Sequence, residues 1–151
     1  MFKRVDANID LPSVESEISA YWDKINAFET SVENRKNDKT FRFYDGPPFP
    51  TGSPHYGNLL AGVIKDIVPR YWTMRGYYVE RRFGWDVHGL PIEMEVQKKL
   101  NLEDPQQIDE YGIDKFNEAC RSQVQTNTEN WEKITRKIGR WVDFENDYKT
   151  M

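Results

Sequence analysis

The segment from Tyr44 to Glu93 constrains the fold more than any other part of this sequence. A short aromatic run over residues 41–45 ends at Gly46-Pro47-Pro48, which neither continues a strand nor easily starts a helix. We therefore predict a buried strand over 41–45, followed by a loop that its prolines hold in one shape at low entropic cost. This loop brings residues 55–58 to the start of a helix, where unpaired N–H groups and the helix dipole attract phosphate.

A long helix is predicted after this loop, because apolar side chains recur at spacings of three and four. We expect Pro69 to kink the helix and Gly76 to end it as a left-handed cap. Residues 77–83 are predicted to form a second strand, with a loop from Gly84 at its carboxyl end. A strand, a crossover helix and a strand give a right-handed parallel unit, and ligands bind beyond the carboxyl ends of its strands. The helix carries its apolar residues in one wide stripe: Leu59, Leu60, Val63, Ile64, Ile67, Val68 and Tyr71.

Amphipathic patterns predict further helices on both sides of this unit. They cover residues 11–28, 90–100 and 116–138, with a short helix opened by Asp104-Pro105. Residues 30–39 are polar and are predicted to form a loop, and residues 139–151 are of mixed character. Two parallel strands are too few for a finished sheet, so most of the apolar surface needs partners outside this chain. The sequence therefore has the character of a fragment.

Composition limits the classes of function. With 151 residues the chain can form one domain with a real core, but hardly two. A net charge of −4 gives no global basic field that would draw it to nucleic acid or membrane. The single cysteine, Cys120, excludes an internal disulfide and a zinc site built on a cysteine pair, and it suits a reducing cytosol. No run of about 18 apolar residues occurs, so we expect a cytoplasmic protein that is neither secreted nor inserted into a membrane.

The chemistry of residues 55–58 leaves two interpretations open. His55 and Asn58 can donate hydrogen bonds to phosphate oxygens, and Gly57 lets a flat ring approach the backbone because it has no Cβ. Alternatively, the histidine only caps a helix. Neither a Walker loop nor a dinucleotide fingerprint is present, so this is not an ordinary phosphate loop.

Other charged side chains also have simple structural alternatives. Asp86 can cap the helix that follows it or pair with Arg82, and His88 can make a structural hydrogen bond. Two basic clusters, one containing Lys65 and the other Arg140, could face nucleic-acid phosphates. A solvated surface is the simpler explanation for both clusters.

Several separated motifs resemble one known family. The run Pro54-His55-Tyr56-Gly57-Asn58 is similar to the His-Ile-Gly-His signature of the class I aminoacyl-tRNA synthetases. The segments 45–48, 84–93 and 138–144 resemble the isoleucine-specific members of that family. The resemblance implies a Rossmann-type α/β catalytic domain of which this chain is the first half of the parallel sheet. It also implies a division into an amino-terminal helical segment (1–40), a nucleotide-binding part (41–100) and a helical segment leading toward an editing region (101–151).

The resemblance implies a role in ATP binding for three residues. His55 and Asn58 would contact the phosphates and stabilise the charge that develops at the α-phosphate, and Gly57 would lie under the adenine. Attack of a carboxylate on ATP needs no protein nucleophile, only alignment and preorganised donors. The chain departs from the family in one respect, because Asn58 stands where the signature has its second histidine. An asparagine donates to phosphate but is never cationic, so we expect a weaker α-phosphate contact.

The resemblance also implies an amino-acid site. Gly46 and Pro47 would border the pocket, and Asp86 would hold the substrate ammonium, since a carboxylate facing an ammonium fixes its orientation. His88 is a further candidate for this site. The run His88-Gly89-Leu90-Pro91 favours isoleucine over valine and leucine.

The implied reaction joins isoleucine to tRNA(Ile) with ATP and Mg²⁺, and no ligand cluster indicates zinc in this segment. The lysine-rich second signature, which binds pyrophosphate, does not occur in the sequence. The remainder of the catalytic domain is therefore required, and the isolated chain is not expected to charge tRNA. The alternatives are a valine- or leucine-specific synthetase and a nucleotide- or tRNA-binding module without catalysis.

Overall fold

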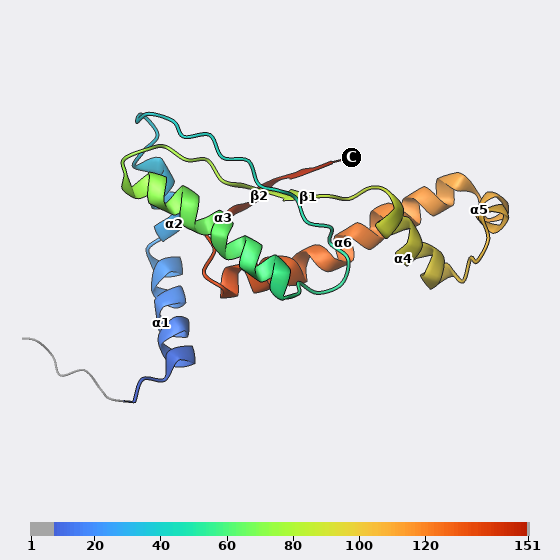
Figure 1. Cartoon of the computed structure of the whole chain (residues 1–151), viewed down its shortest axis with the longest axis horizontal. Coiled ribbons are helices and arrows are strands. Elements are labelled where there is room, and N and C mark those ends of the chain that lie inside the picture. Colours follow the sequence, from blue (N-terminus) through green and yellow to red (C-terminus); the bar gives the residue numbers. More distant parts are fainter. Residues whose placement is uncertain (1–7, 151) are drawn as a thin grey trace, which may run out of the picture.

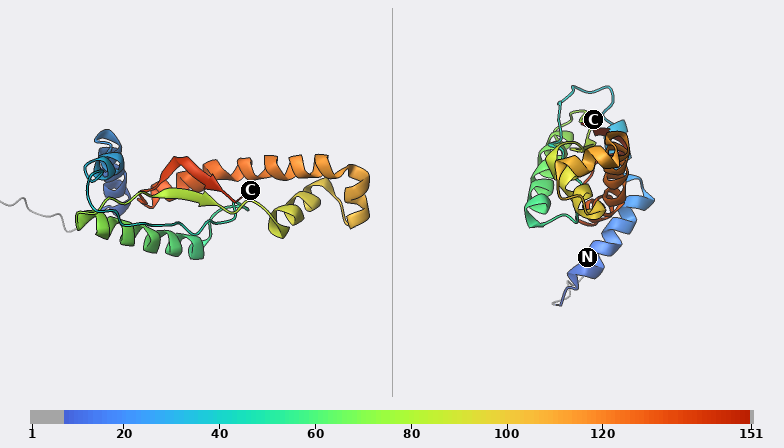
Figure 2. Two further views of the ribbon diagram at one scale, coloured as in Figure 1. Left: turned by 90° about the horizontal axis from the view of Figure 1, so that it is seen from above. Right: turned by 90° about the vertical axis from the view of Figure 1, so that its right-hand side faces the viewer.

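The structure is a computed structural model that describes residues 8–150 (Figure 1). Its two strands, β1 (Arg82–Trp85) and β2 (Asp143–Lys149), pair in parallel. Helix α3 and the carboxyl-terminal part of α6 lie on the same side of the strands, and α4 and α5 extend the molecule at one end (Figures 1 and 2). The helices are α1 (Leu11–Lys24), α2 (Ala27–Glu33), α3 (Tyr56–Met74), α4 (Leu90–Leu100), α5 (Pro105–Tyr111) and α6 (Ile113–Lys137).

The helices agree well with their predictions. α3 has His55 as its N-cap and continues through Pro69, and Gly76 follows it with a φ of 86°. α4 covers residues 90–100 as expected, and α5 opens at Asp104 with a capping box to Gln107. The predicted helix over 11–28 is wrong in one respect. Asn26 adopts a left-handed conformation with a φ of 45°, which ends α1 and places residues 27–33 in a separate helix α2 instead of the expected loop.

The strands differ from their predictions. Residues 41–45 form no strand. An isolated parallel bridge between Thr40 and Tyr78 lies just before them. The strand predicted over 77–83 begins at Arg82 and continues through Gly84 and Trp85, which were expected in a loop. Its partner is β2, which the sequence did not predict. The bridge at residue 40 does not grow into a ladder, and the segment after it ends at Asp45, which pairs with Lys65 of α3 and with Arg140 after α6.

The core lies between β1, β2, α4 and α6. The rings of Phe83 and Trp85 are tilted to each other with their centres 4.5 Å apart, and Trp131 from α6 meets Trp85 edge-on at 6.3 Å. Trp131 is thus a core residue, as its helical spacing indicated. Cys120 packs against this core, and burial raises the pKa of its thiol, with a smaller effect of Glu93. The buried cluster consists of Phe83, Trp85, Val87, Ile92, Val124, Trp131 and Val142.

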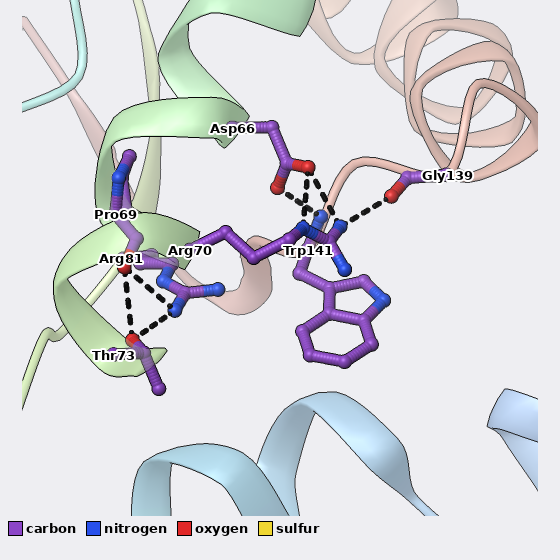
Figure 3. Close-up of polar contacts among 7 residues, drawn as sticks. All are labelled: Asp66, Pro69, Arg70, Thr73, Arg81, Gly139 and Trp141. Atoms are coloured by element: carbon purple, nitrogen blue, oxygen red, sulfur yellow. Dashed lines mark hydrogen bonds and ion pairs between the residues drawn. The ribbon is translucent and has the colours of Figure 1, made fainter. Parts of the chain in front are cut away.

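Helix α3 turns its polar face toward the rest of the chain. Arg70 donates to Asp66 and to the carbonyl of Gly139, while Asp66 also accepts the N–H of Trp141 at 3.0 Å (Figure 3). The guanidinium of Arg70 lies 3.9 Å from the ring centre of Trp141. These contacts join α3 to the segment that leads from α6 to β2. Trp141 therefore packs as a structural residue.

Arg81, the residue before β1, is buried against the polar face of α3. It is 2% exposed and donates to Pro69 O and to the Thr73 hydroxyl (Figure 3). Burial lowers the pKa of its guanidinium to about 10, while nearby Asp66 raises it and Arg70 lowers it by smaller amounts. A buried cation without a direct carboxylate partner is costly, so this contact fixes α3 against β1 at the expense of stability.

The predicted apolar stripe of α3 faces away from the described chain. Its buried residues are Gly62, Pro69 and Thr73, which lie off the stripe. The exposed apolar side chains include Leu60, Val63, Ile64, Ile67, Val68 and Tyr71. This matches the expectation that two strands leave most of the apolar surface uncovered. None of the helices in residues 8–150 has the length and apolar character needed to cross a membrane.

We predict that Gly84→Ala destabilises the pairing of β1 with β2. A Cβ at this position would lie 2.2 Å from Cζ of Tyr148, whose ring is held by its hydrogen bond to Asp45 O. Overpacking of this kind costs about 1–3 kcal/mol. The measurement is hydrogen exchange in peptides covering residues 82–85 and 143–149 of a full-length protein that carries this chain. Exchange should become faster in both peptides.

Gly62→Ala is the matched control. Its Cβ would meet Ile138 at 3.4 Å, an ordinary contact, and alanine in a helix interior is favoured over glycine by about 0.5–1 kcal/mol. Exchange in the strand peptides should therefore stay unchanged in this variant. Equal exchange in Gly84→Ala and Gly62→Ala would contradict the predicted clash.

Candidate functional site

His55 and Asn58 form a reciprocal cap at the start of α3. His55 Nδ1 accepts hydrogen bonds from Gly57 N at 3.1 Å and Asn58 N at 3.4 Å, and Asn58 Oδ1 accepts from His55 N at 3.0 Å. The capping interpretation of the histidine is therefore correct as far as it goes. A side chain at position 57 would lie 3.0 Å from His55 Cε1, so Gly57 is needed for this placement of the ring.

The cap leaves two donors for a ligand. Backbone N–H groups only donate, so Nδ1 of His55 must be an acceptor and the neutral ring carries its proton on Nε2. Asn58 uses its oxygen in the cap and keeps the two N–H bonds of Nδ2. His55 is exposed and Asn58 is half-buried. Capping and phosphate binding are thus compatible, because each side chain uses an acceptor for the cap and retains a donor.

Side chains of α6 hold the loop that leads to His55. Asn127 Nδ2 donates to Pro50 O at 2.8 Å, and Trp131 Nε1 donates to Gly52 O at 2.9 Å. Asn130 Nδ2 donates to Ser53 Oγ at 3.0 Å. Three hydrogen bonds from one helix therefore add to the stiffness that the prolines give this loop. The position of α6 determines where His55 and its donors lie.

Asp45 anchors the other end of the loop. Its carboxylate is 5% exposed and lies 2.8 Å from Lys65 Nζ and 2.7 Å from Arg140 Nη2. Lys65 also donates to Gly46 O, and Tyr148 donates its hydroxyl proton to Asp45 O at 2.6 Å. Burial raises the pKa of this hydroxyl, and the charge of Asp45 raises it further. Gly46 and Pro47 are thereby fixed beside α3.

The surface interpretation is wrong for Arg140, which is 8% exposed and neutralises Asp45. Lys65 also pairs with Asp45, while its side chain stays 26% exposed. Other members of the two clusters, such as Arg82, Arg121 and Arg136, are exposed as expected. Asp45, Lys65 and Arg140 were missed as functional residues. A signal was available for Asp45, because a carboxylate stands directly before Gly46-Pro47-Pro48 in a motif already singled out. No spacing rule connects it to its partners.

Asp86 lies in the loop after β1 and contacts the first loop directly. Its N–H donates to Pro48 O at 2.9 Å, and its Oδ1 accepts the hydroxyl proton of Thr150 at 3.0 Å. The structural alternatives for Asp86 do not occur. The N-cap of α4 is Gly89, and Arg82 pairs with Glu80 instead.

The predicted site residues lie in one region but do not share a single hollow. A small pocket is lined in part by Pro48, Asn58, Lys65 and Arg140. Gly46 and Asp86 each contact a residue that lines this pocket. Lys65 donates to Gly46 O, and Asp86 N donates to Pro48 O. His55, Gly46 and Asp86 do not line this pocket. The described residues contain no cluster of His, Cys, Asp and Glu that could hold a metal ion.

Comparisons with known proteins identify the family. The family model for class I tRNA synthetases (I, L, M and V) matches residues 17–151. The chain belongs to the class I aminoacyl-tRNA synthetases. Within this synthetase family it is 51% identical over 151 residues to the isoleucine–tRNA ligase of Treponema denticola and 54% identical over 142 residues to that of Mycobacterium tuberculosis. It is 51% identical over 146 residues to the cytoplasmic isoleucine–tRNA ligase of Saccharomyces cerevisiae.

These relatives are much longer than the chain. The alignments cover 94–100% of this chain but 14% of each relative. A solved structure, the LeuRS–tRNA–LeuAMS ternary complex of Agrobacterium radiobacter K84, superposes with a TM-score of 0.67 and 22% identity. The superposition covers 95% of this chain and 16% of the LeuRS chain. The predicted fold class is confirmed, and the chain represents the first part of a synthetase catalytic domain.

We predict that Asp45→Asn loosens the loop before α3. Removing one partner of a buried ion pair costs about 3–5 kcal/mol, because the remaining charges stay buried without neutralisation. The measurement is native-state proteolysis within residues 41–54 of a full-length protein. The cleavage rate should rise by about a hundredfold or more where cleavage follows the open population.

Glu80→Gln is the control, because it removes an exposed ion pair with Arg82 worth at most about 1 kcal/mol. Cleavage in residues 41–54 should stay close to the unmodified protein. Equal protection of the loop in both variants would show that the Asp45 ion pairs do not hold it.

Proposed function

We propose that a full-length protein carrying this chain is an isoleucine–tRNA ligase. It activates isoleucine with ATP to isoleucyl-adenylate and pyrophosphate, and it then transfers the isoleucyl group to tRNA(Ile) in the cytoplasm. The observation that carries the proposal is the cap at His55 and Asn58, which leaves two N–H donors at a helix N-terminus beside the loop of Gly46 and Pro47. The identity of 51–54% to isoleucine–tRNA ligases supports the choice of amino acid.

The ATP side of the reaction uses preorganised donors. His55 Nε2–H and Asn58 Nδ2–H donate to phosphate oxygens, and the positive end of the α3 dipole adds to their effect. Both side chains are already fixed by the cap, so they need no reordering when charge develops at the α-phosphate. Gly57 leaves the adenine room at the backbone. Mg²⁺ would arrive on the ATP phosphates, because it is usually bound by substrate phosphates together with one or two carboxylates.

The amino-acid side of the reaction uses the two loops that meet at Pro48 and Asp86. Asp86 Oδ1 is bonded to Thr150, and its carboxylate is half-buried, which suits an acceptor for the substrate ammonium. Gly46 and Pro47 directly precede Pro48 in the first loop, and the hydrogen bond between Asp86 N and Pro48 O keeps the two loops together. The carboxylate of isoleucine and the α-phosphate of ATP then meet in line between the loops and α3.

Pyrophosphate exchange with single amino acids tests the substrate. We expect a full-length protein to exchange label between pyrophosphate and ATP most efficiently with isoleucine. One methylene in an apolar pocket is worth about 10–200-fold, a range for which this synthetase family is the standard case, so kcat/KM for valine should be lower by that factor. Exchange that depends on valine or leucine alone would overturn the choice of isoleucine. No exchange with any amino acid would favour a non-catalytic binding module.

Asn58→His tests the departure from the family signature. We expect this substitution to raise the rate of adenylate formation several-fold, because an imidazolium interacts more strongly with the α-phosphate than an amide does. Asn58→Ala removes both the donor and the cap, and should lower the rate by about 10²–10³-fold. The rates are measured in single turnover with isoleucine and ATP. An unchanged rate in Asn58→His would remove the idea that asparagine weakens this contact.

A further inference from the structure

Thr150 lies directly after β2 and contacts the segment that joins β1 to α4. Its N–H donates to Trp85 O at 3.1 Å. Its hydroxyl oxygen accepts the N–H of Val87 at 3.2 Å, and it lies 3.0 Å from Asp86 Oδ1 and 2.7 Å from His88 Nδ1. Thr150 thus contacts four consecutive residues, from Trp85 at the end of β1 to His88 in the loop that follows.

The hydrogen bonds of this hydroxyl can be assigned by counting protons. A hydroxyl has one proton and two lone pairs. An ionised Asp86 only accepts, so the proton of Thr150 goes to its Oδ1. The N–H of Val87 takes one lone pair, and the contact with His88 Nδ1 must use the other. His88 therefore donates from Nδ1, and in the neutral ring its Nε2 is an acceptor.

His88 and His55 are held in opposite tautomers as a result. The cap of α3 makes Nε2 of His55 a donor, which suits a phosphate. Thr150 makes Nε2 of His88 an acceptor, and the carboxylate of Asp86 lies on the other side of the ring, with its Oδ1 3.6 Å from His88 Nδ1. An acceptor nitrogen and a carboxylate on two nearby residues suit an ammonium group and disfavour a phosphate. This assignment separates the amino-acid side from the ATP side.

We propose that Thr150 is a positioning residue for the substrate ammonium, which acts by orienting Asp86 and by fixing the tautomer of His88. The proposal rests on the proposed function of Asp86. Thr150 itself touches neither substrate. Its backbone bond to Trp85 O survives any side-chain change, so the hydroxyl is separable from the pairing of the strands.

The test is Thr150→Val in a full-length protein, measured by isoleucine-dependent pyrophosphate exchange. Loss of a hydrogen bond to a charged group should raise KM for isoleucine about tenfold, with kcat and KM for ATP within twofold of the unmodified enzyme. Thr150→Ser keeps the hydroxyl and should restore KM for isoleucine to within about threefold. Isoleucinol, which keeps the ammonium but lacks the carboxylate, should inhibit Thr150→Val about tenfold less strongly than the unmodified enzyme.

Thr73→Val is the matched control, because it removes a buried hydroxyl that serves Arg81 and Pro69 near the carboxyl-terminal end of α3, away from His55. Its KM for isoleucine should not change. Thr150→Ala provides a smaller side chain if valine prevents folding, and the same tenfold rise is expected. An unchanged KM for isoleucine in either folded variant, or an equal effect on isoleucine and ATP, would overturn the role of Thr150. If the unmodified protein shows no isoleucine-dependent exchange, the proposed function fails first.

Discussion

The buried carboxylate of Asp45 is the contact on which the site depends. It lies between Lys65 of α3 and Arg140 after α6, and the hydroxyl of Tyr148 holds its carbonyl. A buried charge is stable only when it is paired, so these segments cannot separate without a large cost. The relation between the loop at Gly46 and the start of α3 is fixed in this way. The proposed amino-acid side and the proposed ATP side of the site are therefore held together by a buried ion pair.

Strand β2 supplies the second support, and it holds both loops. Tyr148 donates to the first loop at Asp45 O, and Thr150 binds the second loop at Asp86. Asp147 accepts the indole N–H of Trp85 at 2.7 Å, which fastens β2 to the strand between the loops. Asp147, Tyr148 and Thr150 are half-buried, and Lys149 between them is exposed. β2 therefore stabilises the site through specific hydrogen bonds, in addition to its ladder with β1.

Local features of the structure were predictable from the sequence, and long-range ones were not. The start of α3 at His55 and the bounds of α4 follow from capping and periodicity, which depend on neighbouring residues. The strand over 41–45 was wrong because strand formation depends on a partner, and the partner of β1 is the polar run Asp143–Lys149. His55, Asn58 and Asp86 were found through motifs. Arg140 was not, because its partner Asp45 lies 95 residues away and charge burial leaves no mark on local composition.

The apolar side chains of α3 lie on one face of the helix, as predicted, but this face is the outer one. The orientation of α3 explains why. Asp66, Arg70 and the buried Arg81 bind the polar face of the helix to β1 and to the segment before β2 (Figure 3). The apolar face is exposed, and a two-stranded sheet has no surface left to cover it. The chain spans 14% of the length of its relatives, so we infer that other parts of a full-length protein pack on this stripe. Such packing would hold α3 from both faces and would fix the direction in which His55 and Asn58 present their donors.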